Sequence, residues 1–201
     1  MRPGRAGGGE DADRYIERGL RLVEWGGFTR VRGRSIHLPP LALTLARRGR
    51  FEDALDLVPL VPRSVNSGVT LEAVCEIVAA RGRWNEAAGL VAAAREEAEI
   101  GEQLSLPLFA DRLEGRAAAA NGDATKAAEL LRCSADGFAA LEARWEEACS
   151  RLLLAEALVG TDRQAAEREL RAALPVFEQL GSVLEAERAR ASLERIAVAA
   201  G

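Results

Sequence analysis

The chain has 201 residues, of which 48% are hydrophobic, 29% charged and only 4% aromatic, with a formal net charge of −4. It has no run of about 18 apolar residues, as a membrane-spanning helix needs, and no apolar secretory signal near its start. Ala, Leu, Glu and Arg dominate, a composition that favours helices and disfavours strands. We therefore predict an all-helical protein located in the cytoplasm.

Charge is distributed unevenly along the chain. Residues 1–50 carry 11 arginines against 5 acidic residues, a net charge of +6, whereas residues 51–201 carry 16 bases against 26 acids, a net charge of −10. The stretch from Arg30 to Arg50 contains no acidic residue, which would suit phosphate or an acidic protein surface. The plainer alternative is that arginine is the default surface cation, because 26 of the 27 basic residues are Arg.

The N-terminal region precedes the regular part of the sequence. Residues 1–13 are rich in glycine and charge, which predicts a disordered tail. Residues 14–25 have the pattern of an opening helix, so that residues 14–34 are predicted to form this helix, or a cap, and a basic linker. Pro39 and Pro40 suit the first turn of the next helix, where a missing amide proton costs no hydrogen bond.

A glycine followed five residues later by an alanine occurs repeatedly. The glycines are Gly49, Gly82, Gly122 and Gly160, separated by 33, 40 and 38 residues, a period typical of stacked repeats. Apolar residues at helical spacing precede the first two glycines, and a second apolar stripe follows them. Because glycine adopts the left-handed conformation that closes a helix, each unit is predicted to be helix, turn, helix.

Further prolines mark predicted helix boundaries. Pro59 and Pro62 are expected to end the helix that begins near Phe51, since proline disrupts a helix interior. Pro107 falls early in a helix expected at about 104–120. Pro175 lies in the middle of a helical pattern and predicts a kink there.

The stretches RGRFEDALDL at 48–57 and RGRWNEAAGL at 81–90 share an arginine, a glycine, an aromatic residue two places later and an alanine. In these residues the chain resembles tetratricopeptide repeats, best over 35–94. The later units are longer and are similar to the degenerate repeats of large bacterial ATPase regulators and cyclase-linked ATPases. The resemblance implies a right-handed α-solenoid of about four antiparallel helix pairs over residues 35–201, in the repeat part of a signalling or transcriptional regulator.

Residues that could carry catalysis are few. The chain has one His, one Lys and one Tyr, and it lacks the glycine-rich P-loop motif. Cys75, Cys133 and Cys149 are not spaced as a zinc or disulfide set and are predicted to be small buried thiols. Acidic runs are expected to form solvated helix faces with arginines three or four residues away, as in Glu185 with Arg188. We therefore expect a protein that is not an enzyme and uses no cofactor or metal.

Binding is predicted on the first helix of each unit, whose outward positions line the concave side of a solenoid. In the second unit these positions are Glu72 and Glu76, and in the third they are Arg112 and Arg116. An acidic and a basic patch would then form neighbouring walls of one groove for a protein or peptide. The alternative is ordinary surface charge on amphipathic helices.

Two other functions stay open from the sequence. The basic stretch from Arg30 to Arg50 would contact nucleic acid by neutralising phosphates, although the acidic remainder of the chain would repel it. Self-association is the other, because the end faces of a solenoid need polar caps and the terminal RIAVAAG is a weakly polar one.

Overall fold

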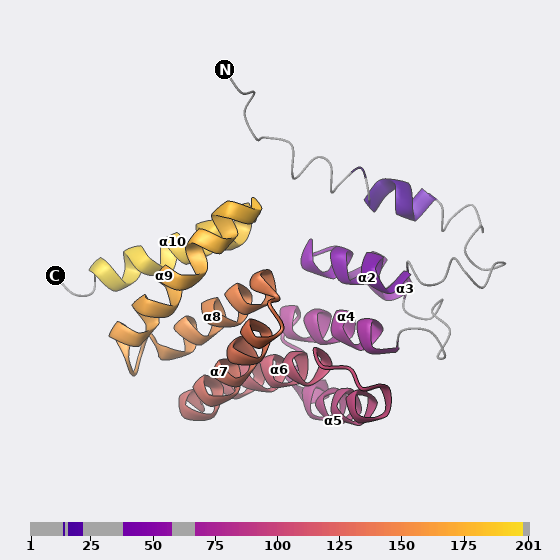
Figure 1. The fold of residues 1–201 in the computed structure, drawn as a ribbon, viewed down its shortest axis with the longest axis horizontal. Helices are drawn as coiled ribbons and strands as arrows, with labels where there is room; N and C mark the ends of the chain where they lie inside the picture. Colours follow the sequence, from indigo (N-terminus) through magenta and orange to yellow (C-terminus); the bar gives the residue numbers. More distant parts are fainter. Residues whose placement is uncertain (1–13, 15, 22–37, 58–66, 199–201) are drawn as a thin grey trace, which may run out of the picture. The chain divides into compact units, whose positions relative to one another are not determined.

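The structure, a computed structural model, describes residues 14, 16–21, 38–57 and 67–198 (Figure 1). All regular secondary structure within these ranges is helical, which confirms the fold class predicted from composition. The chain divides into two compact units, unit 1 (residues 1–80) and unit 2 (residues 81–201), and the predicted repeat domain at 35–201 spans both. Among the described helices, none combines the length and the apolar character needed to cross a membrane.

Unit 1 is organised around α2. Its labelled helices are α2 (Leu38–Arg47), α3 (Phe51–Leu57) and α4 (Ser67–Ala80). Pro39 and Pro40 lie in the first turn of α2, as predicted. α2 packs on both α3 and α4, and the core between them contains fully buried Ile16, Leu45 and Ile77.

Several predictions for the N-terminal region concern residues that the structure does not describe. The predicted opening helix is helical where it is described, at residues 14 and 16–21. The tail at 1–13 and the linker up to residue 34 lie outside the described residues, as do Pro59 and Pro62.

Unit 2 contains a succession of longer helices, which are α5 (Trp84–Gly101), α6 (Leu106–Ala120), α7 (Ala124–Ala140), α8 (Arg144–Leu158), α9 (Arg163–Leu180) and α10 (Val183–Val198). Each of them packs on the next along the chain, and α8 also contacts α6 and α10. Pro107 lies in the first turn of α6, as predicted, and α9 continues through Pro175. The principal core contains Leu131, Leu152 and Phe177, all fully buried.

The four predicted glycines all lie in the short connections between helices, as expected. Gly49, Gly82 and Gly122 have φ of 74°, 64° and 83°, the left-handed backbone that glycine adopts without steric cost. Gly160, between α8 and α9, is not left-handed. There Asp162 closes the turn, because its amide donates to the Leu158 carbonyl oxygen at 2.8 Å and its carboxylate accepts from the amide of α9 residue Ala165 at 2.9 Å.

The close approach of α6 and α7 depends on glycines within the helices. A Cβ on Gly115 of α6 would lie 2.8 Å from Cγ of the buried Leu131 in α7 and 3.3 Å from the Ala127 carbonyl oxygen. A Cβ on Gly137, near the end of α7, would run into Leu108, near the start of α6. The two helices therefore approach closely at two separate places, in each case through a position that has no side chain.

The cysteines differ from one another in burial. Cys75 is buried and Cys149 is half-buried, but Cys133 is exposed, so the prediction of a buried thiol is wrong for this residue. Cys133 lies beside exposed Arg132 on α7, whereas the buried face of that helix carries Leu131 and Ser134. The apolar stripe of α7 passes beside Cys133 and leaves its thiol in solvent.

Candidate functional site

A groove, which we call groove I, lies between α5, α6 and the start of α7, with a volume of about 480 Å³. Half of its lining residues are small and apolar, namely Ala87, Ala88, Val91, Ala92, Ala117 and Ala118. On α5 these residues recur at helical spacing and form a stripe of short side chains, which lines the groove together with two alanines of α6. The missing side-chain volume leaves a hollow, and the ring of Trp84 lines it as well.

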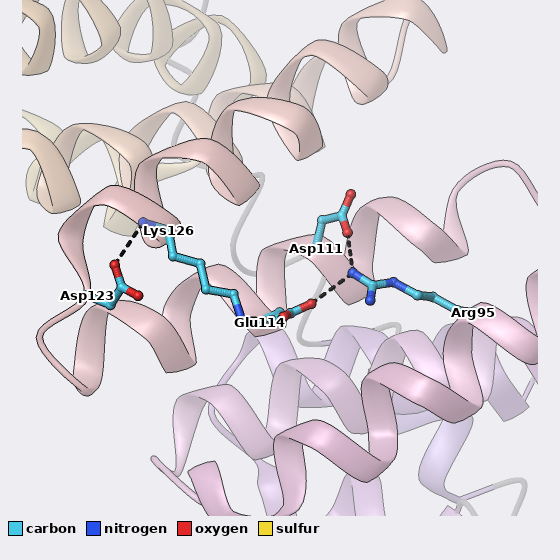
Figure 2. A network of polar contacts seen from close by, with 5 residues as sticks. All are labelled: Arg95, Asp111, Glu114, Asp123 and Lys126. Atoms are coloured by element: carbon cyan, nitrogen blue, oxygen red, sulfur yellow. Dashed lines mark hydrogen bonds and ion pairs between the residues drawn. The ribbon is translucent and has the colours of Figure 1, made fainter.

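The polar lining of groove I includes Arg95, Glu114 and Lys126, which a chain of ion pairs connects (Figure 2). The Arg95 guanidinium is 2.8 Å from both Asp111 Oδ1 and Glu114 Oε2. The other Glu114 oxygen is 2.8 Å from the ammonium nitrogen of Lys126. Three helices are thus joined through two carboxylates of α6, which lie three residues apart and so share a face of that helix.

Asp123, three residues before Lys126, fixes the backbone position of this lysine. Asp123 is the N-cap of α7, and its carboxylate accepts a hydrogen bond of 3.0 Å from the backbone amide of Lys126. An N-cap aspartate satisfies one of the amide groups that a helix leaves without an internal partner. Lys126, which lines groove I, therefore has a defined backbone position.

The ion pairs shift the protonation equilibria of all three partners toward the charged forms. The hydrogen bond from Lys126 lowers the pKa of Glu114, and Arg95 adds to this, against the opposing effect of partial burial. Glu114 in turn raises the pKa of Lys126, and the hydrogen bond to Asp111 is the largest cause that raises the pKa of Arg95. We call Arg95, Glu114 and Lys126 the rim of groove I. At neutral pH all three rim residues are charged, two positively and one negatively.

A smaller groove, groove II, has a volume of about 220 Å³ and is lined mainly by α6, α8 and α10. α6 and α8 are the first helices of the third and fourth predicted units, and α10 follows the fourth unit. Its lining includes apolar Leu153 and Ala157 and charged Arg116, Glu156 and Arg188. The guanidinium of Arg188 holds the Glu156 carboxylate with two hydrogen bonds, of 2.7 and 2.5 Å.

The pairing of Arg188 differs from the sequence prediction. Glu185, three residues before Arg188 on α10, was the expected partner, yet Arg188 binds Glu156 on α8. Glu185 instead accepts a hydrogen bond from the Ser182 hydroxyl group at 2.8 Å. Packing of α10 against α8 brings the acidic side chain of another helix within reach, and this contact replaces the local pair.

Of the predicted binding residues in unit 2, Arg116 is half-buried and lines groove II. Arg112, one turn earlier on α6, differs from the expectation of an outward position, because only 3% of it is exposed. Its guanidinium donates to Glu146 Oε2 and to the Glu146 carbonyl oxygen, both at 2.8 Å, and to the Ser150 hydroxyl at 3.0 Å.

Two aromatic rings complete the surroundings of Arg112. Its guanidinium carbon lies 5.0 Å from the ring centre of Phe109 and 4.8 Å from that of Phe138, close enough for cation–π attraction. Since Phe109, Phe138 and Ser150 belong to α6, α7 and α8, the arginine connects three helices. The correction is therefore that Arg112 stabilises the interior of unit 2.

Glu72 and Glu76 lie on α4 of unit 1, with Glu72 only 8% exposed and Glu76 half-buried. They belong to a different unit from Arg112 and Arg116. The expected outward position is therefore wrong for Glu72 as well as for Arg112, because both are buried. That Glu76 and Arg116 form neighbouring walls of one groove stays a prediction.

Sequence reasoning missed Arg95, Glu114 and Lys126. The only signals for them were that Lys126 is the sole lysine of the chain and that it follows a capping aspartate by three residues. Arg95 and Asp111 are 16 residues apart, far beyond the reach of helical spacing rules.

The two grooves offer apolar surface and ion pairs. In the described ranges, no group of three or more His, Cys, Asp or Glu side chains is arranged to hold a metal ion. Comparisons of the chain with models of protein families, with curated proteins and with solved structures found no match. Groove I combines a floor of small apolar residues with a rim of charged residues.

Proposed function

We propose that this chain is a non-catalytic scaffold that binds a peptide or protein segment in the grooves of unit 2. The observation that carries the proposal is groove I, which has an apolar floor of alanine and valine and a rim that holds Arg95, Glu114 and Lys126. Its volume of about 480 Å³ is within the range of roughly 300–1,000 Å³ found for ligand sites. Apolar side chains of a partner would fill the floor, and the rim would set their orientation.

The proposal includes a repeat architecture for unit 2, with α6–α7 and α8–α9 as antiparallel hairpins of a right-handed solenoid. Short connections at Gly122 and Gly160 support it. A further support is that the second half of α6 meets the first half of α7 at Gly115 and Leu131, while Leu108 near the start of α6 meets Gly137 near the end of α7. This crossed pattern is expected for helices that run in opposite directions.

Groove II extends the proposed binding surface along α6, α8 and α10. Arg116 and the Glu156–Arg188 pair provide polar contacts there, and Leu153 provides an apolar one. Because Trp84 lines both grooves, a single extended segment could contact one groove after the other. Repeat proteins use extended surfaces of this kind for partner segments.

The alternative of nucleic-acid binding gains no support from Arg50, the last residue of the basic stretch. The Arg50 guanidinium is 2.6 Å from Asp53 Oδ2 and 2.9 Å from Glu17 Oε1. The hydrogen bond to Asp53 is the largest cause of its raised pKa, followed by the bond to Glu17. A phosphate would have to compete with two carboxylates for this cation.

The test is selection of binders from a random peptide library displayed on phage, with the full chain as the target. Selected peptides should bind with micromolar or better affinity in fluorescence anisotropy. Ala92→Trp fills the floor of groove I and should weaken their binding at least tenfold. Ala172→Trp is the matched control, since this alanine is also exposed on a helix of unit 2 and lies outside both grooves.

Two results would contradict the proposal. One is a selection that enriches no peptide. The other is a set of enriched peptides whose binding Ala92→Trp and Ala172→Trp weaken equally, with helicity by circular dichroism unchanged in both variants.

A further inference from the structure

Large exposed apolar side chains of unit 2 are concentrated in the connections that follow α5, α7 and α9 and in the helix ends that border these connections. We call this set the apolar edge, and it consists of Ile100, Leu104, Leu141, Leu180, Val183 and Leu184. Exposed fractions reach 75% at Ile100 and 65% at Leu184. The connections that follow α6 and α8 contribute only Val159, at 37%, to the exposed large apolar residues described in unit 2, and Val198 at the end of α10 is the remaining one.

The three connections that carry the apolar edge lie on the same side of unit 2 (Figure 1). Contacts between side chains join neighbouring connections. Trp145 Nε1 donates to the Ser182 hydroxyl oxygen at 2.9 Å, which links the connection after α7 to the one after α9. Leu108 and Gly137, which lie close together, flank the connections after α5 and α7. The six apolar residues therefore belong to one continuous edge of the helical array.

The same edge is strongly acidic. The segments 96–105, 136–144 and 177–187 contain nine acidic residues and one base, Arg144. The connections on the opposite side, 117–126 and 156–166, contain three acidic residues and two bases. Glu178 is paired with Arg190, which lies just beyond the last segment, and the remaining excess of carboxylates beside the exposed apolar side chains would attract a cationic partner.

Backbone geometry shows that the acidic residues occupy positions where glycine would be easier. Glu102 and Glu142 have φ of 51° and 55°, a left-handed conformation that side-chain-bearing residues seldom adopt. The corresponding position in the third connection is Gly181, with φ of 72°. Two turns of the apolar edge therefore carry a glutamate, although a left-handed backbone is unfavourable for a residue with a side chain.

We propose that the apolar edge docks a cationic amphipathic helix of a partner protein. Leucine-like side chains of that helix would cover the edge residues, and its Lys and Arg side chains would lie among the surrounding carboxylates. Consecutive connections are two helices apart, so at roughly 9 Å per helix–helix spacing the edge spans about 35 Å. A helix of about 23 residues has this length. Anionic lipid and nucleic acid are excluded as occupants because the edge would repel them.

A synthetic helix tests this proposal directly. The probe is a labelled peptide of about 22 residues with Leu on one helical face and Lys elsewhere, and the comparison peptide has Glu in place of every Lys. With the full chain, fluorescence anisotropy should give at least tenfold tighter binding for the Lys peptide. Combining Ile100→Ser, Leu104→Ser and Leu184→Ser should weaken that binding at least tenfold.

The matched control combines Val159→Ser with Val198→Ser, which remove exposed apolar residues away from the edge, and it should change binding less than twofold. Combining Glu99→Gln, Glu102→Gln and Glu142→Gln should weaken binding several-fold at 50 mM salt and much less at 0.5 M, where charges are screened. Ala92→Trp should leave the Lys peptide bound, which separates this proposal from groove binding.

Three outcomes would overturn the proposal. The first is equal affinity for the Lys and Glu peptides. The second is equal loss of binding in the edge variant and in the Val159/Val198 control, with helicity by circular dichroism retained in both. The third is a dimer of the full chain in sedimentation that the edge variant converts to a monomer, because the occupant would then be a second copy.

Discussion

The guanidinium of Arg112 forms three hydrogen bonds inside unit 2, two to Glu146 and one to Ser150. Glu146 neutralises its charge, Ser150 accepts one further hydrogen bond, and Ser134 shares a hydrogen bond of 2.8 Å with Ser150. A buried charge is tolerated only when it is paired and its donors are satisfied. Arg112 meets both conditions, so its role is to join α6 to α8 by hydrogen bonds and to α7 through the ring of Phe138.

Replacing Arg112 by methionine is expected to destabilise the protein by about 3 kcal/mol, because the Glu146 carboxylate would lose its partner in a mostly buried site. The measurement is urea unfolding followed by circular dichroism. Arg171→Met is the control: this arginine is 72% exposed and pairs with Glu167 in the same helix, so a loss below about 0.5 kcal/mol is expected. Equal effects of the two substitutions would contradict the role assigned to Arg112.

Glu114 should make the stability of unit 2 depend on pH. Its pKa in the folded protein is lowered by Lys126 and Arg95, so its stabilising contribution is full above the ordinary glutamate value of about 4.3. The contribution is lost as the pH falls through the lowered pKa. The difference in unfolding free energy between the natural chain and Glu114→Gln is therefore expected to shrink from pH 7 to pH 3.

Urea titrations at several pH values measure this difference, and a magnitude of about 0.5–1 kcal/mol is expected at pH 7. The cations of Arg95 and Lys126 stay protonated throughout this range, since both pKa values are raised. A difference that grows toward low pH would show that Glu114 is not held by these cations.

The glycines of the helix connections differ in backbone conformation. Gly122 has a φ of 83° and Gly160 is outside the left-handed region, although the same spacing to a following alanine marks both. Neither has an atom within 4 Å of a Cβ built on it. Any difference between alanine substitutions at these two turns must therefore come from the backbone.

Gly122→Ala is expected to destabilise the protein by about 1 kcal/mol, the cost of left-handed backbone for a residue with a side chain. Gly160→Ala should be neutral or stabilising by up to about 0.5 kcal/mol, because alanine restricts the unfolded chain. Thermal and urea unfolding of the two variants measure the difference. A Gly160→Ala loss as large as that of Gly122→Ala would contradict the observed geometry of this turn.

At the scale of the whole molecule, each unit has its own hydrophobic core. The core of unit 1 includes Ile16 and Ile77, and that of unit 2 extends from Ala128 to Ile196. The boundary between the units falls after Ala80, in the connection from α4 to α5. The residues of the second core therefore all belong to unit 2.

Residues 81–201 expressed alone should consequently fold. We expect a helical circular dichroism spectrum and one cooperative urea transition, because the residues of the unit 2 core all lie within this fragment. The full chain serves as the reference. A fragment that is largely unfolded, or that loses its helices gradually without a transition, would contradict this expectation.

Properties that depend on residues close together in the chain were predictable. Composition and periodicity predicted an all-helical protein, and the glycine pattern located the connections at Gly49, Gly82, Gly122 and Gly160. Helix propensity and helix termination are local effects, decided within a few residues. The candidate site was predicted only in part, since Arg116 lines a groove and Arg112 is buried.

The amino-acid sequence by itself thus determined that the chain is helical and where four of the helix connections lie. Only the tertiary structure decided which face of α6 is buried, which carboxylate Arg188 binds, and that Arg95, Glu114 and Lys126 meet at one groove. It also brought the apolar residues of three separate connections to one edge. The physical reason is distance along the chain: Arg112 and Glu146 are 34 residues apart, and only packing of whole helices brings such residues into contact.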